Sequence, residues 1–139
     1  MNQAEVVRRM LDAFYSSGLE GASAFYDPEI SWTSRFPRER VLRGPEEVAH
    51  GLDELQATGR TIVPITRDVV DRGPCVVVPG EMQIRERGSV RQTQVWWVMR
   101  VRSGKVLWGE DCLSRRQLDA AVARAGAEGQ DASGVSSSD

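Results

Sequence analysis

Four β-rich runs that follow one another with only short turns between them constrain this fold more than any other feature. They cover residues 61–70, 75–87, 90–102 and 105–113. The intervening turns, at residues 71–74, 87–89 and 103–104, all contain glycine, as hairpin turns commonly do. Because hairpin turns join antiparallel neighbours, these runs predict an antiparallel meander.

Helical patterns precede the strands. Apolar residues at helical spacing predict helices over 3–17, about 19–26 and about 44–57. A short strand, Ile30–Thr33, lies between the second and the third of these helices. A capping-box sequence at Ser114 starts a last short helix that ends near Ala125. This order predicts an α+β fold, with a cone-shaped curved antiparallel sheet wrapped around about three N-terminal helices and a short C-terminal helix.

The length of 139 residues suits one domain, which we expect to cover residues 1–125. Residues 126–139 carry too little apolar surface to order themselves, so a disordered tail is expected there. Lys plus Arg number 18 and Asp plus Glu 20, a net charge of -2 that argues against nucleic acid as a partner. No apolar run is long enough to span a membrane, and the N-terminus has no signal-peptide core, so we expect a cytoplasmic protein.

Metal and cofactor chemistry is not indicated. The chain has one histidine and two widely separated cysteines, Cys75 and Cys112, without the short spacing of a zinc site. His50 falls opposite the apolar side of its predicted helix, which makes a catalytic triad hard to build. The sequence therefore predicts no metal and no cofactor.

The strand over residues 90–102 is apolar on both faces. Val95, Trp97 and Met99 share one face, and Trp96 and Val98 share the other. We expect the first face to line the core and a hollow inside the curled sheet, where a small molecule could bind. The second face is expected to pack on another copy of the chain and to form a homodimer.

Four segments are informative together: VVRRMLDAF at 6–14, FYDP at 25–28, RGPEEV at 43–48 and GKVLWGEDCLSRR at 104–116. They resemble the nuclear-transport-factor-two-like superfamily, particularly its SnoaL-like and limonene-epoxide-hydrolase-like members. The resemblance covers about residues 3–123. It implies a small-molecule pocket and an acid–base enzyme of epoxide hydrolase, cyclase or isomerase type, which acts on a small apolar metabolite without a cofactor. The alternatives are a non-catalytic ligand-binding or accessory dimeric domain, and a dimerisation module with a filled cone.

Asp111 is the first candidate catalytic residue. It falls where the epoxide-hydrolase-like members carry an acid on their last strand, so the resemblance implies a catalytic role. By strand alternation it shares a face with Leu107 and Leu113 and can project into an apolar hollow. Burial there would raise the pKa of the carboxyl and suit it to act as a general acid. Alternatively, Asp111 caps a turn or pairs with Arg115 or Arg100.

The resemblance implies further catalytic positions. Glu81 roughly matches the second acid of those hydrolases, but it alternates with the apolar residue Met82, so an exposed strand glutamate is the alternative. Ser31 and Thr33 match the positions that hold water. The arginine that orients the two acids falls near Pro79, which cannot serve in that role, and Arg91 or Arg85 are possible substitutes.

We expect substrate contacts from the inward side chains of the long strands and from the first helix. Tyr15, on the flank of the apolar face of that helix, either points its hydroxyl into the hollow or packs in the core. Trp97 either packs in the core or stacks on a ligand. The predicted substrate-binding residues are Tyr15, Trp32, Val95, Trp97, Met99, Leu107 and Leu113.

Overall fold

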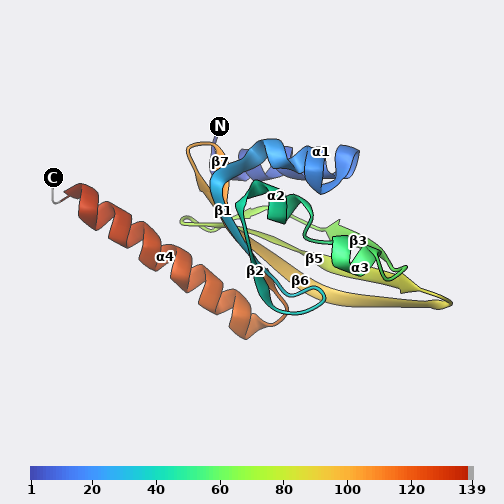
Figure 1. Cartoon of the computed structure of the whole chain (residues 1–139). Helices are drawn as coiled ribbons and strands as arrows, with labels where there is room; N and C mark the ends of the chain where they lie inside the picture. The colour runs from blue at the N-terminus through green and yellow to red at the C-terminus, as the bar shows by residue number, and fades with distance from the viewer. Residues whose placement is uncertain (138–139) are drawn as a thin grey trace.

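The computed structural model describes residues 1–137, with side chains described as far as residue 128. Helices dominate the first part of the chain and strands the second, as predicted (Figure 1). In chain order the elements are α1 (Gln3–Ala22), the 3-10 helix η1 (Ser23–Phe25), β1 (Tyr26–Ser34), β2 (Arg40–Arg43), α2 (Gly44–Ala49), α3 (Asp53–Gln56), β3 (Thr61–Thr66), β4 (Val70–Asp71), β5 (Val76–Glu86), β6 (Ser89–Arg102), β7 (Lys105–Cys112) and α4 (Arg115–Ser137).

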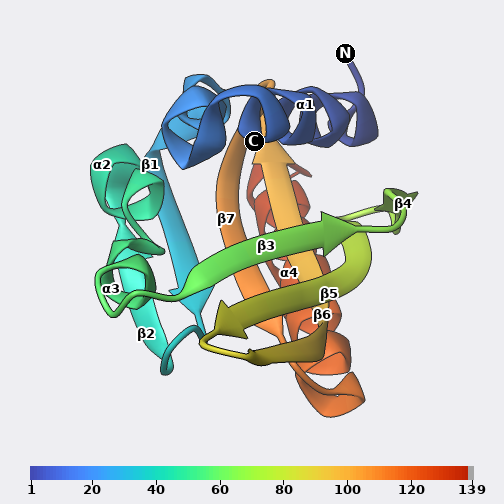
Figure 2. The same cartoon turned by 90° about the vertical axis from the view of Figure 1, so that its right-hand side faces the viewer.

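The strands form one curved sheet with the order β2-β1-β7-β6-β5-β3, and β4 pairs with β5. Strands β3, β5, β6 and β7 are antiparallel neighbours, which confirms the predicted meander. Strand β1 lies parallel to β7, so the sheet is mixed where the sequence predicts antiparallel pairs only. A parallel pair needs a long crossover, and the chain from β2 to β6 provides it. Figure 2 shows the resulting twist, with β3 and β5 crossing in front of β7.

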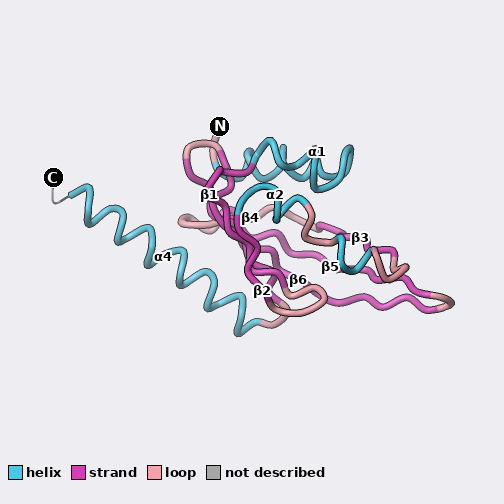
Figure 3. The backbone as a smooth tube through the Cα atoms, viewed as in Figure 1, coloured by secondary structure: helices cyan, strands magenta, loops and turns pink. Residues whose placement is uncertain are grey.

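The N-terminal helices cover the concave face of this sheet (Figures 2 and 3). Helix α1 bends at Gly18, whose φ of 72° lies in the left-handed region that glycine adopts most easily. Its buried residues Val7 and Met10 join the main core, together with Val78 and Met99 from the strands. The predicted cone architecture is therefore confirmed, with its larger core between the helices and the sheet.

Helix α4 packs on the opposite, convex face and creates a second core. Leu118, Ala121 and Ala125 follow one side of the helix and cover Val98, which is fully buried. The surface that the sequence assigns to a second copy, around Trp96 and Val98, is thus covered by the chain's own helix, and that assignment is wrong. The amphipathic pattern of α4 supplies the cover that was expected from a partner.

Helix α4 is also longer than the sequence predicts, because it continues past Ala125 to Ser137. The added segment contains no proline, and its alanines, Glu128 and Gln130 favour helix, whereas its three glycines disfavour it. Residues 138–139 of the predicted tail lie outside the described residues. No helix in residues 1–137 has the length and hydrophobicity of a membrane span.

Candidate functional site

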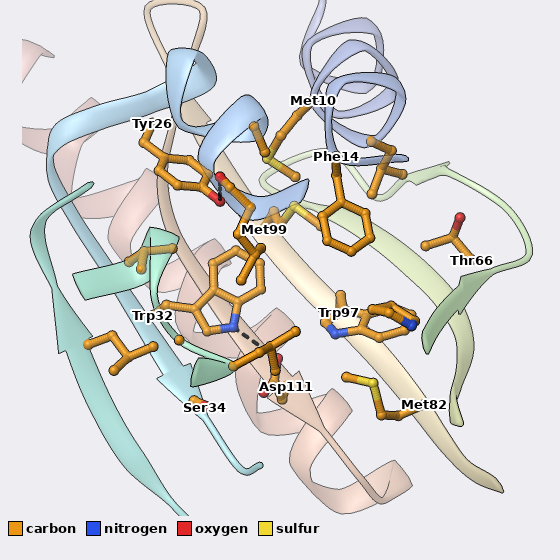
Figure 4. Close-up of a pocket in the computed structure, with 18 residues that line it drawn as sticks. Met10, Phe14, Tyr26, Trp32, Ser34, Thr66, Met82, Trp97, Met99 and Asp111 are labelled. Carbon is orange, nitrogen blue, oxygen red and sulfur yellow. Dashed lines mark hydrogen bonds between the residues drawn. The ribbon is translucent and has the colours of Figure 1, made fainter. Parts of the chain in front are cut away.

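A cavity of about 110 Å³ lies between the concave face of the sheet and the N-terminal helices (Figure 4). Its walls are almost entirely apolar and aromatic, as in many small-molecule sites. The lining residues are Met10, Leu11, Phe14, Leu19, Ala22, Tyr26, Trp32, Ser34, Leu42, Val48, Gly51, Leu52, Pro64, Thr66, Met82, Trp97, Met99 and Asp111. The cone is therefore hollow and not completely filled by side chains.

Asp111 supplies the only carboxylate among the described residues that line this cavity. It lies near the end of β7 and is 6% exposed. The indole Nε1–H of Trp32 donates to Oδ1 at 2.9 Å, and the backbone N–H of Arg35 donates to Oδ2 at 3.1 Å. Both oxygens are thus held by donors of fixed position, which orients the carboxyl toward the cavity (Figure 4).

Burial dominates the proton affinity of Asp111. Desolvation raises its pKa above the ordinary aspartate value, and the hydrogen bonds from Trp32 and from the backbone of Arg35 oppose that rise only in part. The positive charge of Arg35 also acts to lower the pKa. A carboxyl with a raised pKa in an apolar cavity can give or take a proton, which is the chemistry of a general acid or base.

The raised pKa of Asp111 has a consequence for stability. Its folded-state pKa lies above that of the unfolded chain, so the protonated carboxyl favours folding, and this contribution is lost as pH rises through the folded-state pKa. We expect the free energy of unfolding of the wild type, measured in urea at several pH values, to fall relative to that of Asp111→Asn across this window. A difference between the two proteins that stays constant with pH would contradict the expectation.

Two tryptophans approach the sheet closely because glycines lie beneath them. A Cβ atom at Gly109 would come within 2.2 Å of the Trp32 ring, so only glycine on β7 leaves room for the indole there. A Cβ at Gly80 would lie 2.8 Å from the ring of Trp97 and 2.0 Å from the backbone oxygen of Ile65. Glycine at these two positions of the sheet therefore sets where the aromatic walls of the cavity stand.

Three hydroxyl groups also line the cavity, those of Tyr26, Ser34 and Thr66. Burial raises the pKa of Tyr26 to about 12, so its hydroxyl stays protonated at neutral pH and its O–H donates to the backbone oxygen of Leu19 at 3.5 Å. The hydroxyl of Tyr15 lies 2.9 Å from that of Thr66 and accepts a hydrogen bond from the Thr66 backbone N–H. Tyr15 itself is 55% exposed and is not among the lining residues, so it supports Thr66 from outside.

The structure does not bring Glu81 into the cavity. Its neighbour Met82 lines the cavity, and strand alternation turns Glu81 to the convex face, where it pairs with Arg67 at 2.8 Å. Ser31 and Thr33 are likewise absent from the lining, because they alternate along β1 with the lining residues Trp32 and Ser34. The expected pair of acids around one cavity is therefore not present.

The predicted substrate-binding residues divide into two groups. Trp32, Trp97 and Met99 line the cavity. Val95 is fully buried in the core, Leu113 packs against that core, and neither lines the cavity. Leu107 is also outside the lining because the β6–β7 register shifts there: Val106 pairs with Val101 but Trp108 pairs with Arg100.

Several residues at the cavity are missing from the sequence prediction. Ser34 and Thr66 end strands β1 and β3 and face the cavity, but neither has a distinctive sequence context. Arg35 contacts Asp111 although it follows β1 by one residue and lies far from Asp111 in sequence. Alternation along β1 would have identified Ser34 if the strand had been extended beyond Thr33.

Neither cysteine of the chain lines the cavity. Cys75 and Cys112 are both free and buried in the core beneath α4, away from the cavity. Within the described part of the chain, no three histidine, cysteine or acidic side chains are grouped as metal ligands would be. What the arrangement offers chemically is one buried carboxyl, fixed N–H donors and three hydroxyls in an apolar cavity.

Solved structures share this architecture. An NTF2-like protein from Burkholderia thailandensis matches with a TM-score of 0.70 and 20% identity, over 85% of this chain and 95% of that chain. The protein TerC, co-crystallised with polyporic acid, gives 0.63 and 18%, over 85% and 95%. An LEH-like epoxide hydrolase from M. tuberculosis gives 0.61 and 16%, over 87% and 89%. At such identities the similarity shows the fold alone.

Comparison of the sequence with protein families is more specific than comparison of the folds. No curated protein matches the chain significantly. Residues 7–108, however, match the SnoaL-like domain, and this range runs from the first helix to the strand that carries Asp111. The match spans well over half of the sequence, and the hollow cone agrees with it. The chain therefore belongs to the SnoaL-like domain family.

Proposed function

We propose that this protein is a cofactor-independent proton-transfer enzyme that acts on a small, largely apolar molecule bound in the cavity, with Asp111 as the general acid or base. One observation carries the proposal: a carboxyl that is almost completely buried faces an apolar cavity, and it is the only carboxylate that the described residues bring to that cavity. Desolvation of this kind brings the pKa of a carboxyl closer to neutral pH, where proton transfer is most efficient.

The position of Glu81 favours one reaction class over another. Hydrolysis of an epoxide by two cooperating carboxyls needs both of them at one cavity, and Glu81 lies on the opposite face of the sheet from Asp111. A single carboxyl is sufficient where one group removes a proton from carbon and returns it elsewhere. We therefore favour isomerisation or cyclisation by proton transfer.

The proposed roles follow from the contacts of each group. Ionised Asp111 takes a proton from a carbon beside a carbonyl, and the electron pair of the broken C–H bond moves toward the carbonyl oxygen. The indole of Trp32 and the backbone N–H of Arg35 hold the carboxyl in place during the transfer. The hydroxyl of Thr66 can donate to the substrate oxygen, where negative charge develops, when the Tyr15 hydroxyl donates to it; that of Ser34 donates to the backbone oxygen of Phe36.

The comparisons support a ligand with both apolar surface and oxygen atoms. TerC was crystallised with polyporic acid, and the M. tuberculosis protein is an epoxide hydrolase, so this fold accommodates such molecules. The walls of the present cavity are tryptophan, phenylalanine and methionine side chains, which suit a flat apolar body. We propose a substrate of this class for the SnoaL-like domain described here.

A nitrobenzisoxazole provides a direct test, because a base that removes its C–H proton breaks the N–O bond and releases a coloured phenolate. We expect the wild-type protein to accelerate this ring opening, with a rate that rises with pH as Asp111 ionises. The midpoint of the profile should lie above the pKa of an ordinary aspartate, since burial raises the pKa of this carboxyl. No acceleration over acetate buffer at any pH would contradict the proposal.

Binding without catalysis is the competing outcome. A flat apolar ketone that stabilises the protein against heat, but is recovered chemically unchanged and without exchange of its protons with deuterated solvent, would indicate a ligand-binding domain. The homodimer stays a prediction, and light scattering would measure it. Its interface has to use a surface other than the one that α4 covers.

A further inference from the structure

Glu110 is a buried acid that the proposed chemistry does not use. It precedes Asp111 on β7, so its side chain lies on the convex face of the sheet, and it is only 2% exposed. Two arginines hold it: Nη1 of Arg35 donates to Oε2 at 2.8 Å, and Nη1 of Arg124 donates to Oε1 at 2.7 Å. A charge buried this deeply needs such partners, and each carboxylate oxygen has one.

Arg35 reaches both faces of the sheet. Its backbone N–H donates to Asp111 on the cavity side, and its guanidinium donates to the Glu110 carboxylate and to the backbone oxygen of Asp111. The side chain of Arg35 is 13% exposed and also pairs with Glu39 at 2.9 Å. Fixing the guanidinium therefore fixes the backbone N–H that holds the cavity carboxyl.

We propose that Glu110 is a positioning residue for Asp111: it anchors the Arg35 guanidinium on the convex face, and this anchor keeps the Arg35 backbone N–H on the carboxyl that faces the cavity. Arg124 extends the network to α4, which connects the outer helix to the same anchor. The inference rests on the position of Asp111 in the cavity. It is independent of whether the proposed reaction occurs.

A direct electrostatic effect of Glu110 would act in the opposite direction from positioning. Glutamine in place of Glu110 removes a negative charge from the neighbourhood of Asp111, and by Coulomb's law alone this lowers the pKa of Asp111. If Glu110 acts as an anchor, the same change removes the buried charge that holds Arg35 and leaves it with Glu39 and the backbone oxygen of Asp111, and the weakened hydrogen bond from its backbone N–H raises the pKa of Asp111. The sign of the shift therefore separates the two roles.

The other groups that face Asp111 are few in the described part of the chain. Among the described residues, Tyr26 is the one other titratable group of the cavity lining, and burial keeps it protonated. The charged or titratable groups around the carboxyl, on both faces of the sheet, are Tyr26 on β1, Arg35 after β1, Glu110 and Cys112 on β7, and Arg124 on α4. Of these, only Arg35 contacts the Asp111 carboxyl directly.

The test follows the carboxyl carbon of Asp111 by NMR across a pH titration, in wild-type protein and in Glu110→Gln. We expect the midpoint to move to higher pH by about half a unit or more, which is about a threefold change in the ionised fraction below the midpoint. An unchanged or lowered midpoint would overturn the proposal. Glu128→Gln is the matched control, because Glu128 accepts hydrogen bonds from Trp108 and Arg100 on the same face without touching Arg35. The midpoint of the Asp111 titration in this variant should equal that of the wild type.

Should Glu110→Gln fail to fold, Arg35→Lys provides the same test with the positive charge retained. Lysine cannot reproduce the contacts of a guanidinium with Glu110, Glu39 and the backbone of Asp111, so we again expect a raised midpoint. An unchanged midpoint would show that charge alone matters and would refute the anchor. A raised NMR midpoint in a protein that lacks nitrobenzisoxazole turnover would contradict the proposed function and leave the anchor standing.

Discussion

Asp111→Asn is expected to lower the nitrobenzisoxazole turnover by about 100- to 10,000-fold, the usual contribution of a positioned acid or base. Asparagine has nearly the same shape and can still accept the hydrogen bond from Trp32, but it cannot take a proton from carbon. The measurement is kcat/KM for wild type and variant, with circular dichroism to show that the fold is retained. Turnover within about twofold of the wild type would remove Asp111 from the mechanism.

Glu81→Gln is the matched control for that experiment. Glu81 is also a carboxylate of the curved sheet, but it pairs with Arg67 on the convex side and is outside the cavity lining. If one carboxyl performs the chemistry, this variant keeps the wild-type rate and pH profile. A loss as large as that of Asp111→Asn would support a two-carboxyl reaction and would contradict the single-acid proposal.

Gly109→Ala is expected to have the largest effect on stability. A Cβ at this position would lie 2.2, 2.3 and 2.6 Å from three carbon atoms of the Trp32 ring, far inside van der Waals contact. The indole has to move, and it then loses its hydrogen bond to Asp111 and its place in the cavity wall. We expect a loss of about 1–3 kcal/mol in the free energy of unfolding, as for other overpacked cores.

Urea unfolding measures this loss, and tryptophan fluorescence reports the displaced indole. Turnover of the nitrobenzisoxazole should fall as well, since Asp111 is then held at one oxygen only. Gly126→Ala provides the control: it lies in α4, and a Cβ there would be 4.0 Å from the nearest atom, a carbon of Pro74. That variant should be as stable as the wild type or more stable by up to about 1 kcal/mol, because alanine favours helix.

The strand part of the fold could be predicted from the sequence because hairpin turns and alternating patterns are local signals. Strands β3, β5, β6 and β7 all fall inside the predicted runs or within one residue of them. The pairing of β1 with β7 depends on contacts between residues far apart in the chain, which no local pattern encodes. Strand β2 could not be predicted either, because it has only four residues and begins and ends with an arginine, which gives no strong strand pattern.

The candidate site was partly predictable for the same reason. Strand position and the family resemblance predict Asp111, Trp32 and Trp97 as site residues, and all three line the cavity. Ser31 and Thr33 came from matching positions with the hydrolases, and the register of β1 turns them to the other face. A displacement of one residue in a strand exchanges the two faces, so the position of a residue in an aligned sequence does not establish its side of the sheet.

The cover that α4 provides could not be foreseen from strand β6 alone. An apolar outer face requires some cover, and the pattern of β6 does not distinguish a partner from a helix of the same chain. Leu118, Ala121 and Ala125 indicate an amphipathic helix of suitable width. The face of the sheet that this helix contacts is set by the turn after β7. Val98 is therefore buried because the outer face of β6 is apolar, as predicted, but α4 covers it and not a second copy of the chain.

The neighbouring acids of β7 make the chemistry of this protein sensitive to insertions and deletions. Glu110 and Asp111 point to opposite faces, and the register of β7 against β6, which shifts between Val106 and Trp108, sets which of them faces the cavity. A shift of that register by one residue would present the other acid to the ligand and leave its neighbour among the arginines. During evolution, an insertion or deletion at this irregularity of the β6–β7 hairpin could therefore replace the reactive group without any substitution at the site itself.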